Sequence, residues 1–252
     1  MSRLLLSLAL LLGSLLSVSA QSLSPETLNY KITYKWGLIH KQAGTARFVL
    51  TRPNASTFDA RLYARTQPWA DVLYKVRDTL TTTFSSSTFM PEVYHRIAHE
   101  DGSYAHDILK FSRSGNTSSA VCRRIRRGKK DTSNTETSIS LSATGPTVDL
   151  LSSFYYIRTL PYSTLKPGYK QIVNIFSGKR KELLAITYLG KEDLKMDKIT
   201  QPVYHIRFTF TSEGKKETSR PIDAWLSTSP GHVPLKLVGE LKIGKVQCFL
   251  IQ

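Results

Sequence analysis

The sequence predicts a mainly β protein: an antiparallel meander that forms a closed or half-open β-barrel, or a strongly curved sheet, with one or two short covering helices. Apolar and polar residues alternate along 28–36, 58–65 and 204–210, which is the pattern of strands buried on one face. Turn-forming residues separate many such segments at the short spacing of hairpins. One longer segment, from Thr147 to Pro161, has the spacing of an amphipathic helix.

The three alternating segments are rich in the β-branched and aromatic residues that suit a pleated surface. Further strands are expected at 46–51, 78–84, 92–100, 103–112, 171–176, 183–190, 222–226, 235–242 and 246–251. Gly or Asn stands where a tight reversal needs positive φ, in Asp101-Gly102, Ser114-Gly115-Asn116, Ser177-Gly178-Lys179 and Glu213-Gly214-Lys215. Consecutive strands should therefore pair antiparallel.

The main helix is expected to begin near Thr147 and to end before Pro161, because proline cannot continue a helix. Its apolar stripe consists of Leu150, Leu151, Phe154 and Tyr155, followed at the same spacing by Arg158. Such a stripe needs a sheet to cover. A shorter helical turn is expected at 68–75, although an irregular strand corner would look similar.

The segment 113–144 is rich in Ser, Thr, Asn and basic residues, and we expect it to form an exposed basic hairpin or loop. Its basic run supplies six cations, Arg123, Arg124, Arg126, Arg127, Lys129 and Lys130. These residues are candidates for contact with anionic lipid or lipopolysaccharide. The commoner explanation of such a run is solvated charge on a hairpin tip.

The N-terminus has the features of a secretory signal peptide: Arg3, the apolar run 4–12, and the small residues Val18-Ser19-Ala20. We expect residues 1–20 to be removed after Ala20, and 21–252 to form a single domain in the periplasm. The alternative, a retained membrane anchor, is disfavoured because the apolar run is shorter than the ~20 residues of a spanning helix. No cysteine near the cut could accept a lipid.

The chain carries 35 Lys and Arg against 19 Asp and Glu, a formal net charge of +16. Such a charge attracts polyanions, which in a cell envelope are anionic lipids, lipopolysaccharide and acidic glycans. Nucleic acid is a poor fit in that compartment. The alternative is a diffuse basic surface that keeps the protein in solution.

The two cysteines, Cys122 and Cys248, could pair in an oxidising compartment. The favoured alternative is that each is a small buried apolar residue. Cys248 alternates with Val246 and Leu250, as a core position would.

A two-residue turn at Asp101-Gly102 would set three pairs of residues opposite each other: His99 and Tyr104, Ile97 and His106, Arg96 and Asp107. His95, His99 and His106 would then share one face, within reach of a zinc ion. The favoured interpretation is that these histidines are exposed to solvent, because no carboxylate or thiol completes a ligand set. We therefore expect neither a metal nor a cofactor. The pair of Arg96 and Asp107 is expected to be a cross-strand ion pair.

The sequence contains no Gly-x-Ser-x-Gly elbow, no phosphate-binding glycine loop and no His-Glu-x-x-His helix. We therefore expect a protein that is not an enzyme. A hydrolase would be the least surprising exception, but no nucleophile can be named for it.

Several short motifs occur in a fixed order: Leu28-x-Tyr30-x-Ile32-x-Tyr34 with Ala43-Gly44, Tyr74-x-Val76-Arg77-Asp78, Glu100-Asp101-Gly102-x-Tyr104, Asp149-x-x-Ser152-x-x-Tyr155-x-x-Arg158, Ala224-Trp225-Leu226-Ser227, Val233-Pro234 and Gly244. In this order the chain resembles the bacterial domain-of-unknown-function family 3108. The resemblance spans nearly all of the chain after the signal peptide. It implies an exported envelope protein with an antiparallel β-barrel or curved sheet, and no established activity.

The resemblance also draws attention to the polar positions Arg77, Asp78, Tyr155 and Arg158. Arg77 and Asp78 begin a predicted strand and Arg158 lies on the predicted helix, so we expect them to meet at the barrel mouth. They would form either a buried ion-pair network that fixes the helix to the sheet or a site that orients a ligand.

The leading functional hypothesis is a periplasmic binding or carrier module, whose concave face under the helix 148–160 holds a lipid-like or amphipathic envelope molecule. The alternative is a structural or assembly factor of the envelope that contacts anionic glycolipid or another protein. An outer-membrane barrel and a hydrolase are less favoured.

Overall fold

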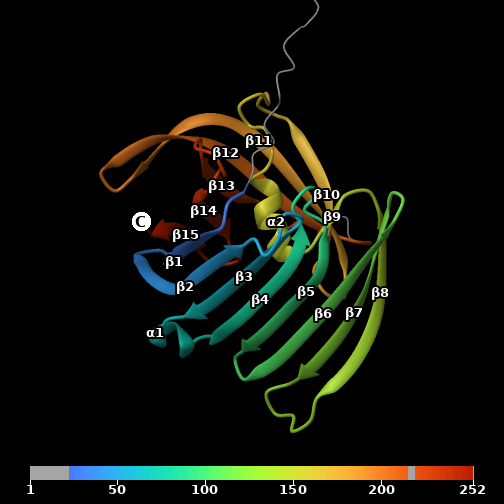
Figure 1. Cartoon of the computed structure of the whole chain (residues 1–252). Helices are drawn as coiled ribbons and strands as arrows, with labels where there is room; N and C mark the ends of the chain where they lie inside the picture. The colour runs from blue at the N-terminus through green and yellow to red at the C-terminus, as the bar shows by residue number, and fades with distance from the viewer. Residues whose placement is uncertain (1–22, 215–218, 252) are drawn as a thin grey trace, which may run out of the picture.

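The computed structural model describes residues 23–214 and 219–251, which form a sheet of 15 strands. The sheet curls into a nearly closed barrel around the helix α2 (Leu150–Ile157), as Figure 1 shows. The predicted mainly β fold with short helices is confirmed. The predicted signal peptide, 1–20, lies outside the described residues.

The strands follow the chain as an antiparallel meander, in the order β8-β7-β6-β5-β4-β3-β2-β1-β15-β14-β13-β12-β11-β10-β9. The first half comprises β1 (Glu26–Trp36), β2 (Ile39–Thr51), β3 (Thr57–Thr66), β4 (Val76–Ser85), β5 (Pro91–Glu100), β6 (Ser103–Ser114), β7 (Thr117–Arg127) and β8 (Thr135–Thr144). The second comprises β9 (Thr147–Val148), β10 (Lys170–Phe176), β11 (Lys181–Met196), β12 (Ile199–Ser212), β13 (Ile222–Ser227), β14 (Pro234–Glu240) and β15 (Lys245–Ile251). A short helix, α1 (Pro68–Asp71), joins β3 to β4.

The turn between β5 and β6 has the predicted register: His99 faces Tyr104 and Arg96 faces Asp107. Asp101 and Gly102 have φ values of 46° and 86°, the left-handed conformation that a two-residue hairpin turn requires. A second glycine, Gly44, is required by close approach, because a Cβ there would lie 2.6 Å from the carbonyl oxygen of Arg65.

The helix α2 begins at a capping box. The carboxylate of Asp149 accepts hydrogen bonds from the backbone N–H groups of Leu151 (2.7 Å) and Ser152 (2.8 Å), and the Ser152 hydroxyl accepts one from the Asp149 N–H. The helix starts three residues later than Thr147, because Thr147 and Val148 form the parallel strand β9 beside β10.

Two apolar clusters fill the barrel. One packs α2 against the first half of the sheet and includes Tyr155, Phe84 and Leu109. The other lies against β10–β13 and includes Ile157, Ile175 and Ile206. On α2 itself, the ring of Phe154 stacks on that of Phe48, with a centroid separation of 4.2 Å. The helix therefore occupies the concave side of the sheet.

The segment 113–144, expected to be an exposed basic hairpin or loop, contains the whole of β7 and β8, which pair as an antiparallel hairpin within the sheet. Its Ala120 and Cys122 are buried in the core. The residues alternate in burial along β7, so the high Ser and Thr content marks a solvated strand face rather than a loop.

The two cysteines do not pair. Cys122 lies on β7, Cys248 lies on β15, and both are free thiols. Burial raises the pKa of each thiol to about 11. Cys122 is thus the small buried apolar residue of the alternative interpretation.

Candidate binding surface

Arg158 follows α2 and is almost completely buried, with 1% of its surface exposed. Its guanidinium donates to the Glu26 carboxylate from Nη1 (2.5 Å) and Nη2 (3.1 Å), and from Nε to the carbonyl oxygen of Gly231 (2.7 Å). His232 Nδ1 lies 2.9 Å from the Arg158 carbonyl oxygen, so Nδ1 carries a proton. Arg158 therefore anchors the helix to β1 and to the loop between β13 and β14.

Arg158 does not meet Arg77 and Asp78, contrary to the expectation from sequence. Arg77 forms its ion pair with Asp71 of α1, at 2.6 Å. Asp78 faces the other side of β4 and lies 3.7 Å from Arg96. Alternation along the strand turns Arg77 and Asp78 to opposite faces of the sheet, and the guanidinium of Arg158 is bound by Glu26 instead.

Tyr155, the remaining candidate, packs within the barrel. Its ring stacks on Phe84 with a centroid separation of 5.6 Å, and its hydroxyl is buried without a hydrogen-bond partner among the described residues. Burial raises the pKa of Tyr155 far above its usual range. The concave face expected to hold a ligand is here occupied by α2.

Asp107 and Arg96, expected to form a cross-strand ion pair, each pair with other residues on the inner face of the sheet. Asp107 is 3% exposed and pairs with Arg124 (3.1 Å) and Arg126 (2.5 Å), not with the opposing Arg96. Arg96 turns to Glu100 at 2.6 Å and to Asp78. Burial, followed by the charge of Glu100, raises the pKa of Asp78 to about 6.

Four of the six cations of the basic run pair with three carboxylates within the fold. Arg124 and Arg126 are held by Asp107, Arg123 pairs with Glu136 at 2.5 Å, and Lys129 pairs with Asp101 at 3.2 Å. The Arg127 guanidinium lies over the ring of Tyr104, 5.8 Å from its centroid. Lys130 has no ion pair with any described residue.

The three histidines share one face, but they do not form a ligand set. His95 Nδ1 and His106 Nε2 are 3.1 Å apart and share a hydrogen bond, while His99 packs on Tyr104. Burial lowers the pKa values of His95 and His106. Over residues 23–214 and 219–251, no group of three His, Cys, Asp or Glu side chains could hold a metal ion.

The face of the sheet turned away from α2, here called the outer face, carries two hollows that adjoin. Its side chains follow from the register: Asn29 and Lys31 of β1 lie opposite Ile251 and Phe249 of β15. On the other side of β1, Asn29 lies opposite Arg47. Tyr30, which lies between Asn29 and Lys31 on β1, points inward and contacts Phe154.

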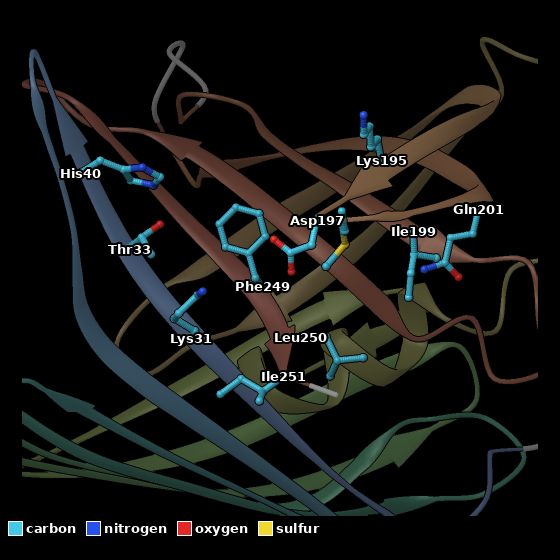
Figure 2. A pocket seen from close by; sticks show the side chains of 11 residues that line it. Lys31, Thr33, His40, Lys195, Asp197, Ile199, Gln201, Phe249, Leu250 and Ile251 are labelled. Carbon is cyan, nitrogen blue, oxygen red and sulfur yellow. The ribbon is translucent and has the colours of Figure 1, made fainter.

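The first hollow, here called the hairpin hollow, has a volume of about 570 Å³ and lies between β1, β15 and the tip of the β11–β12 hairpin (Figure 2). Its apolar lining comprises Met196, Ile199, Phe249, Leu250 and Ile251. Its charged lining comprises Lys31, His40, Lys195 and Asp197. Phe249 and Asp197 lie at the centre of the view, and the Lys31 ammonium is 6.0 Å from the Phe249 ring centroid.

The second hollow, here called the arginine hollow, has a volume of about 930 Å³ and extends over β1–β5. It is bounded by two cross-strand rows of side chains, one running from Thr45 through Arg65 and Arg77 to His99. The other row runs from Ile251 and Asn29 through Arg47 and Tyr63 to Thr79. Tyr30, Ala46, Ala64 and Asp78 lie in the strands between the two rows.

The two hollows adjoin at Ile251, which lines both, and together they are here called the outer groove. Arg47 and Arg65 are exposed, and neither forms an ion pair with another described residue. Arg65 also lies directly opposite Arg77, and like charges at that distance repel each other. The hairpin hollow thus combines apolar side chains with Lys31, His40, Lys195 and Asp197, and the arginine hollow carries unpaired guanidinium groups.

Sequence reasoning found only part of this groove: the candidates Arg77 and Asp78 line the arginine hollow, whereas Tyr155 and Arg158 line neither hollow. Arg47, Tyr63 and Arg65 were visible only as outward positions of alternating strands, and nothing in the sequence sets β1 beside β15. One sequence feature could have indicated an anion-binding surface here: the outward positions of 28–36 and 58–65 carry several cations and few carboxylates.

A family model of proteins of unknown function, DUF3108, matches residues 29–250. The chain belongs to the DUF3108 family. No curated protein matches its sequence. Among the described residues, no helix has the length and apolar character needed to cross a bilayer.

The chain matches several solved structures, including the following two. A β-barrel-like protein of the DUF1849 family from Brucella abortus has 12% sequence identity and a TM-score of 0.61, over 92% of this chain and 98% of that one. A putative exported protein with a YmcC-like fold from Bacteroides fragilis has 7% identity and a TM-score of 0.34, over 91% of this chain and 95% of that one. The first similarity supports the barrel fold.

Proposed function

We propose that this DUF3108 protein is a non-catalytic binding protein, exported to the periplasm, that holds one anionic amphipathic molecule in the outer groove. The observation that carries the proposal is that the hairpin hollow, with apolar side chains at Phe249, Met196 and Ile199, adjoins a hollow lined by the unpaired guanidinium groups of Arg47 and Arg65. Ligand pockets commonly enclose about 300–1,000 Å³, a range that includes both hollows.

The chemistry of the two ends defines the class of ligand. An alkyl chain would lie against Phe249, Met196 and Ile199, where burial of apolar surface favours binding. An anionic head would lie at Arg47 and Arg65, since the planar guanidinium binds phosphate and carboxylate with two parallel hydrogen bonds. The anion would also relieve the repulsion between Arg65 and Arg77.

Isothermal titration calorimetry of the purified chain 21–252 tests this, with decyl phosphate, inorganic phosphate and decyltrimethylammonium as ligands. We expect decyl phosphate to bind, and the headgroup alone or the cationic amphiphile to bind at least tenfold more weakly. Equal affinity for the anionic and the cationic amphiphile would overturn the proposal, because the arginines would then contribute nothing.

Two variants connect the affinity to the groove. Arg47→Gln with Arg65→Gln should weaken decyl phosphate binding at least tenfold, as expected from losing two charge-assisted hydrogen-bonding groups. Lys110→Gln is the matched control, an exposed cation on β6 that lines neither hollow. Both variants should keep the wild-type melting temperature.

Export is tested separately. The proposal predicts that the protein purified from the periplasmic fraction of a Gram-negative host begins at Gln21. An intact Met1 in a cytoplasmic fraction would contradict the location but not the binding.

A further inference from the structure

Three neighbouring loops lie at one end of the barrel: the β1–β2 turn, the α1 connection between β3 and β4, and the β14–β15 turn. They are neighbours because β4, β3, β2, β1, β15 and β14 are consecutive in the sheet. Figure 1 shows the β1–β2 turn and α1 at the same side of the molecule. Hydrogen bonds join the loops, from Trp69 Nε1 to the Gln42 carbonyl oxygen (2.7 Å) and from the Tyr34 hydroxyl to the Ile243 carbonyl oxygen (3.1 Å).

These loops, here called the apolar rim, expose large apolar side chains to an unusual degree. The relative exposure of these side chains is 104% for Leu38, 85% for Val72, 76% for Leu73, 60% for Ile243, 54% for Trp36, 49% for Tyr74 and 45% for Leu241. Single exposed apolar residues need no explanation, but a group on three adjacent loops marks a surface that contacts another apolar phase.

Lysines are interspersed with these apolar residues. The only carboxylates in the segments 35–41, 66–77 and 240–245 are Asp71 and Glu240, and each is already paired, with Arg77 and with Lys245. This leaves Lys35, Lys41, Lys75 and Lys242 without an ion pair to any described residue. The ammonium of Lys41 lies over the ring of Trp69, 4.7 Å from its centroid.

A third hollow of about 530 Å³ opens beside the rim, between the β1–β2 turn and strands β13–β15. Its lining includes Lys35, Lys236 and Lys245 with the rings of Trp36 and Trp225. Cations beside indole rings suit a phosphate headgroup, whose charge the lysines bind while the rings contact the glycerol and upper chain region.

We propose that the apolar rim docks the protein on the surface of an anionic phospholipid bilayer. Leu38, Val72 and Leu73 enter the acyl boundary, Trp36 and Tyr74 lie at headgroup depth, and the four unpaired lysines contact anionic headgroups. The inference goes beyond the proposed function, since docking needs no ligand in the outer groove.

The chemistry of the rim favours a bilayer over a protein partner. The centre of a protein–protein interface is depleted in lysine, whereas lysines here lie between the apolar tips. Exposed apolar side chains on separate loops, interspersed with aromatic rings and lysines, are the combination of residues found where proteins meet a membrane interface. Four unpaired cations and no unpaired carboxylate also give the rim the sign of charge that anionic lipid requires.

Sedimentation with sucrose-loaded vesicles tests the docking. We expect the chain 21–252 to bind vesicles of 30% phosphatidylglycerol in phosphatidylcholine, to bind pure phosphatidylcholine much more weakly, and to dissociate as salt is raised. Leu38→Ser with Val72→Ser and Leu73→Ser should lower the partition coefficient at least tenfold. Lys35→Gln with Lys75→Gln and Lys242→Gln should lower it on the order of a hundredfold, since each lysine near such a surface contributes about fivefold.

Matched control variants carry the same types of substitution elsewhere. Val121→Ser with Ile172→Ser removes exposed apolar side chains from β7 and β10, and Lys110→Gln removes an exposed cation from β6. These controls should sediment with vesicles as the wild type does. All variants should bind decyl phosphate with wild-type affinity, so loss of docking is separable from loss of the proposed ligand.

Three results would overturn the inference. One is failure of the wild type to bind anionic vesicles at low salt, and another is binding that the rim substitutions leave unchanged. The third is a dimer in light scattering that the Leu38, Val72 and Leu73 substitutions dissociate, because the rim would then contact a second copy of the chain.

Discussion

Removing the carboxylate of Glu26 should destabilise the barrel strongly, because it leaves the guanidinium of Arg158 buried without its counter-ion. Arg158 is 1% exposed on its side chain and Glu26 is 20% exposed. Loss of one partner from a buried pair costs about 3–5 kcal/mol, and Glu26→Gln keeps one acceptor oxygen, so we expect about 3 kcal/mol. In a domain of this size that is a fall in melting temperature of about 6–12 °C.

Urea unfolding followed by tryptophan fluorescence measures this, in a cycle with Arg158→Met and the double variant. Arg158→Met should lower the free energy of unfolding less than Glu26→Gln does. The carboxylate of Glu26 is already part exposed, so water can hydrate it when the guanidinium is removed. The double variant should be more stable than the sum of the two single effects predicts, by about 2 kcal/mol. A change below about 1 kcal/mol for Glu26→Gln, or strict additivity, would refute the reasoning that this pair anchors α2 to β1.

Three other predictions follow from buried groups. The pKa of Asp78 is raised from 3.8 to about 6, so the stability that its protonation contributes is fully present below pH 3.8 and is lost as pH rises through 6. Asp78→Asn should remove this part of the dependence of unfolding free energy on pH. An unchanged pH dependence in the variant would contradict the shift. Gly44→Ala should lower the free energy of unfolding, measured in urea, by about 1–3 kcal/mol, because the new Cβ would meet the Arg65 carbonyl oxygen. The control Gly239→Ala, whose Cβ would have ordinary contacts, should change it by less than about 0.5 kcal/mol. Cys122 is fully buried, so a thiol reagent should modify it only after unfolding, and rapid modification of the native protein would contradict its position.

The sequence contained enough to predict the class of fold and most of its local structure. Alternation in 28–36 and 204–210 records which face of each strand is buried, and the positive φ of Asp101 and Gly102 fixes a hairpin register to the residue. The helix was visible because its apolar stripe and Pro161 are local signals. Such features depend on residues close together in the chain, so they can be read directly.

Features that depend on distant strands could not be predicted. The pairing of β1 with β15 joins residues more than 200 positions apart, and it alone brings Phe249 beside Lys31 to form the outer groove. Ion-pair partners were misjudged for the same reason. Arg158 pairs with Glu26 of β1 and Asp107 pairs with Arg124 of β7, and these pairings depend on how the barrel packs.

Photolabelling locates the bound amphiphile most directly. The chain 21–252 would be irradiated with an alkyl phosphate that carries a diazirine near the end of its chain, digested, and analysed by mass spectrometry. We predict adducts in the peptides that contain Met196, Ile199 and Phe249, and their loss when decyl phosphate competes. Adducts on α2, at 150–157, would place the ligand on the concave side of the sheet and contradict the assignment of the outer groove.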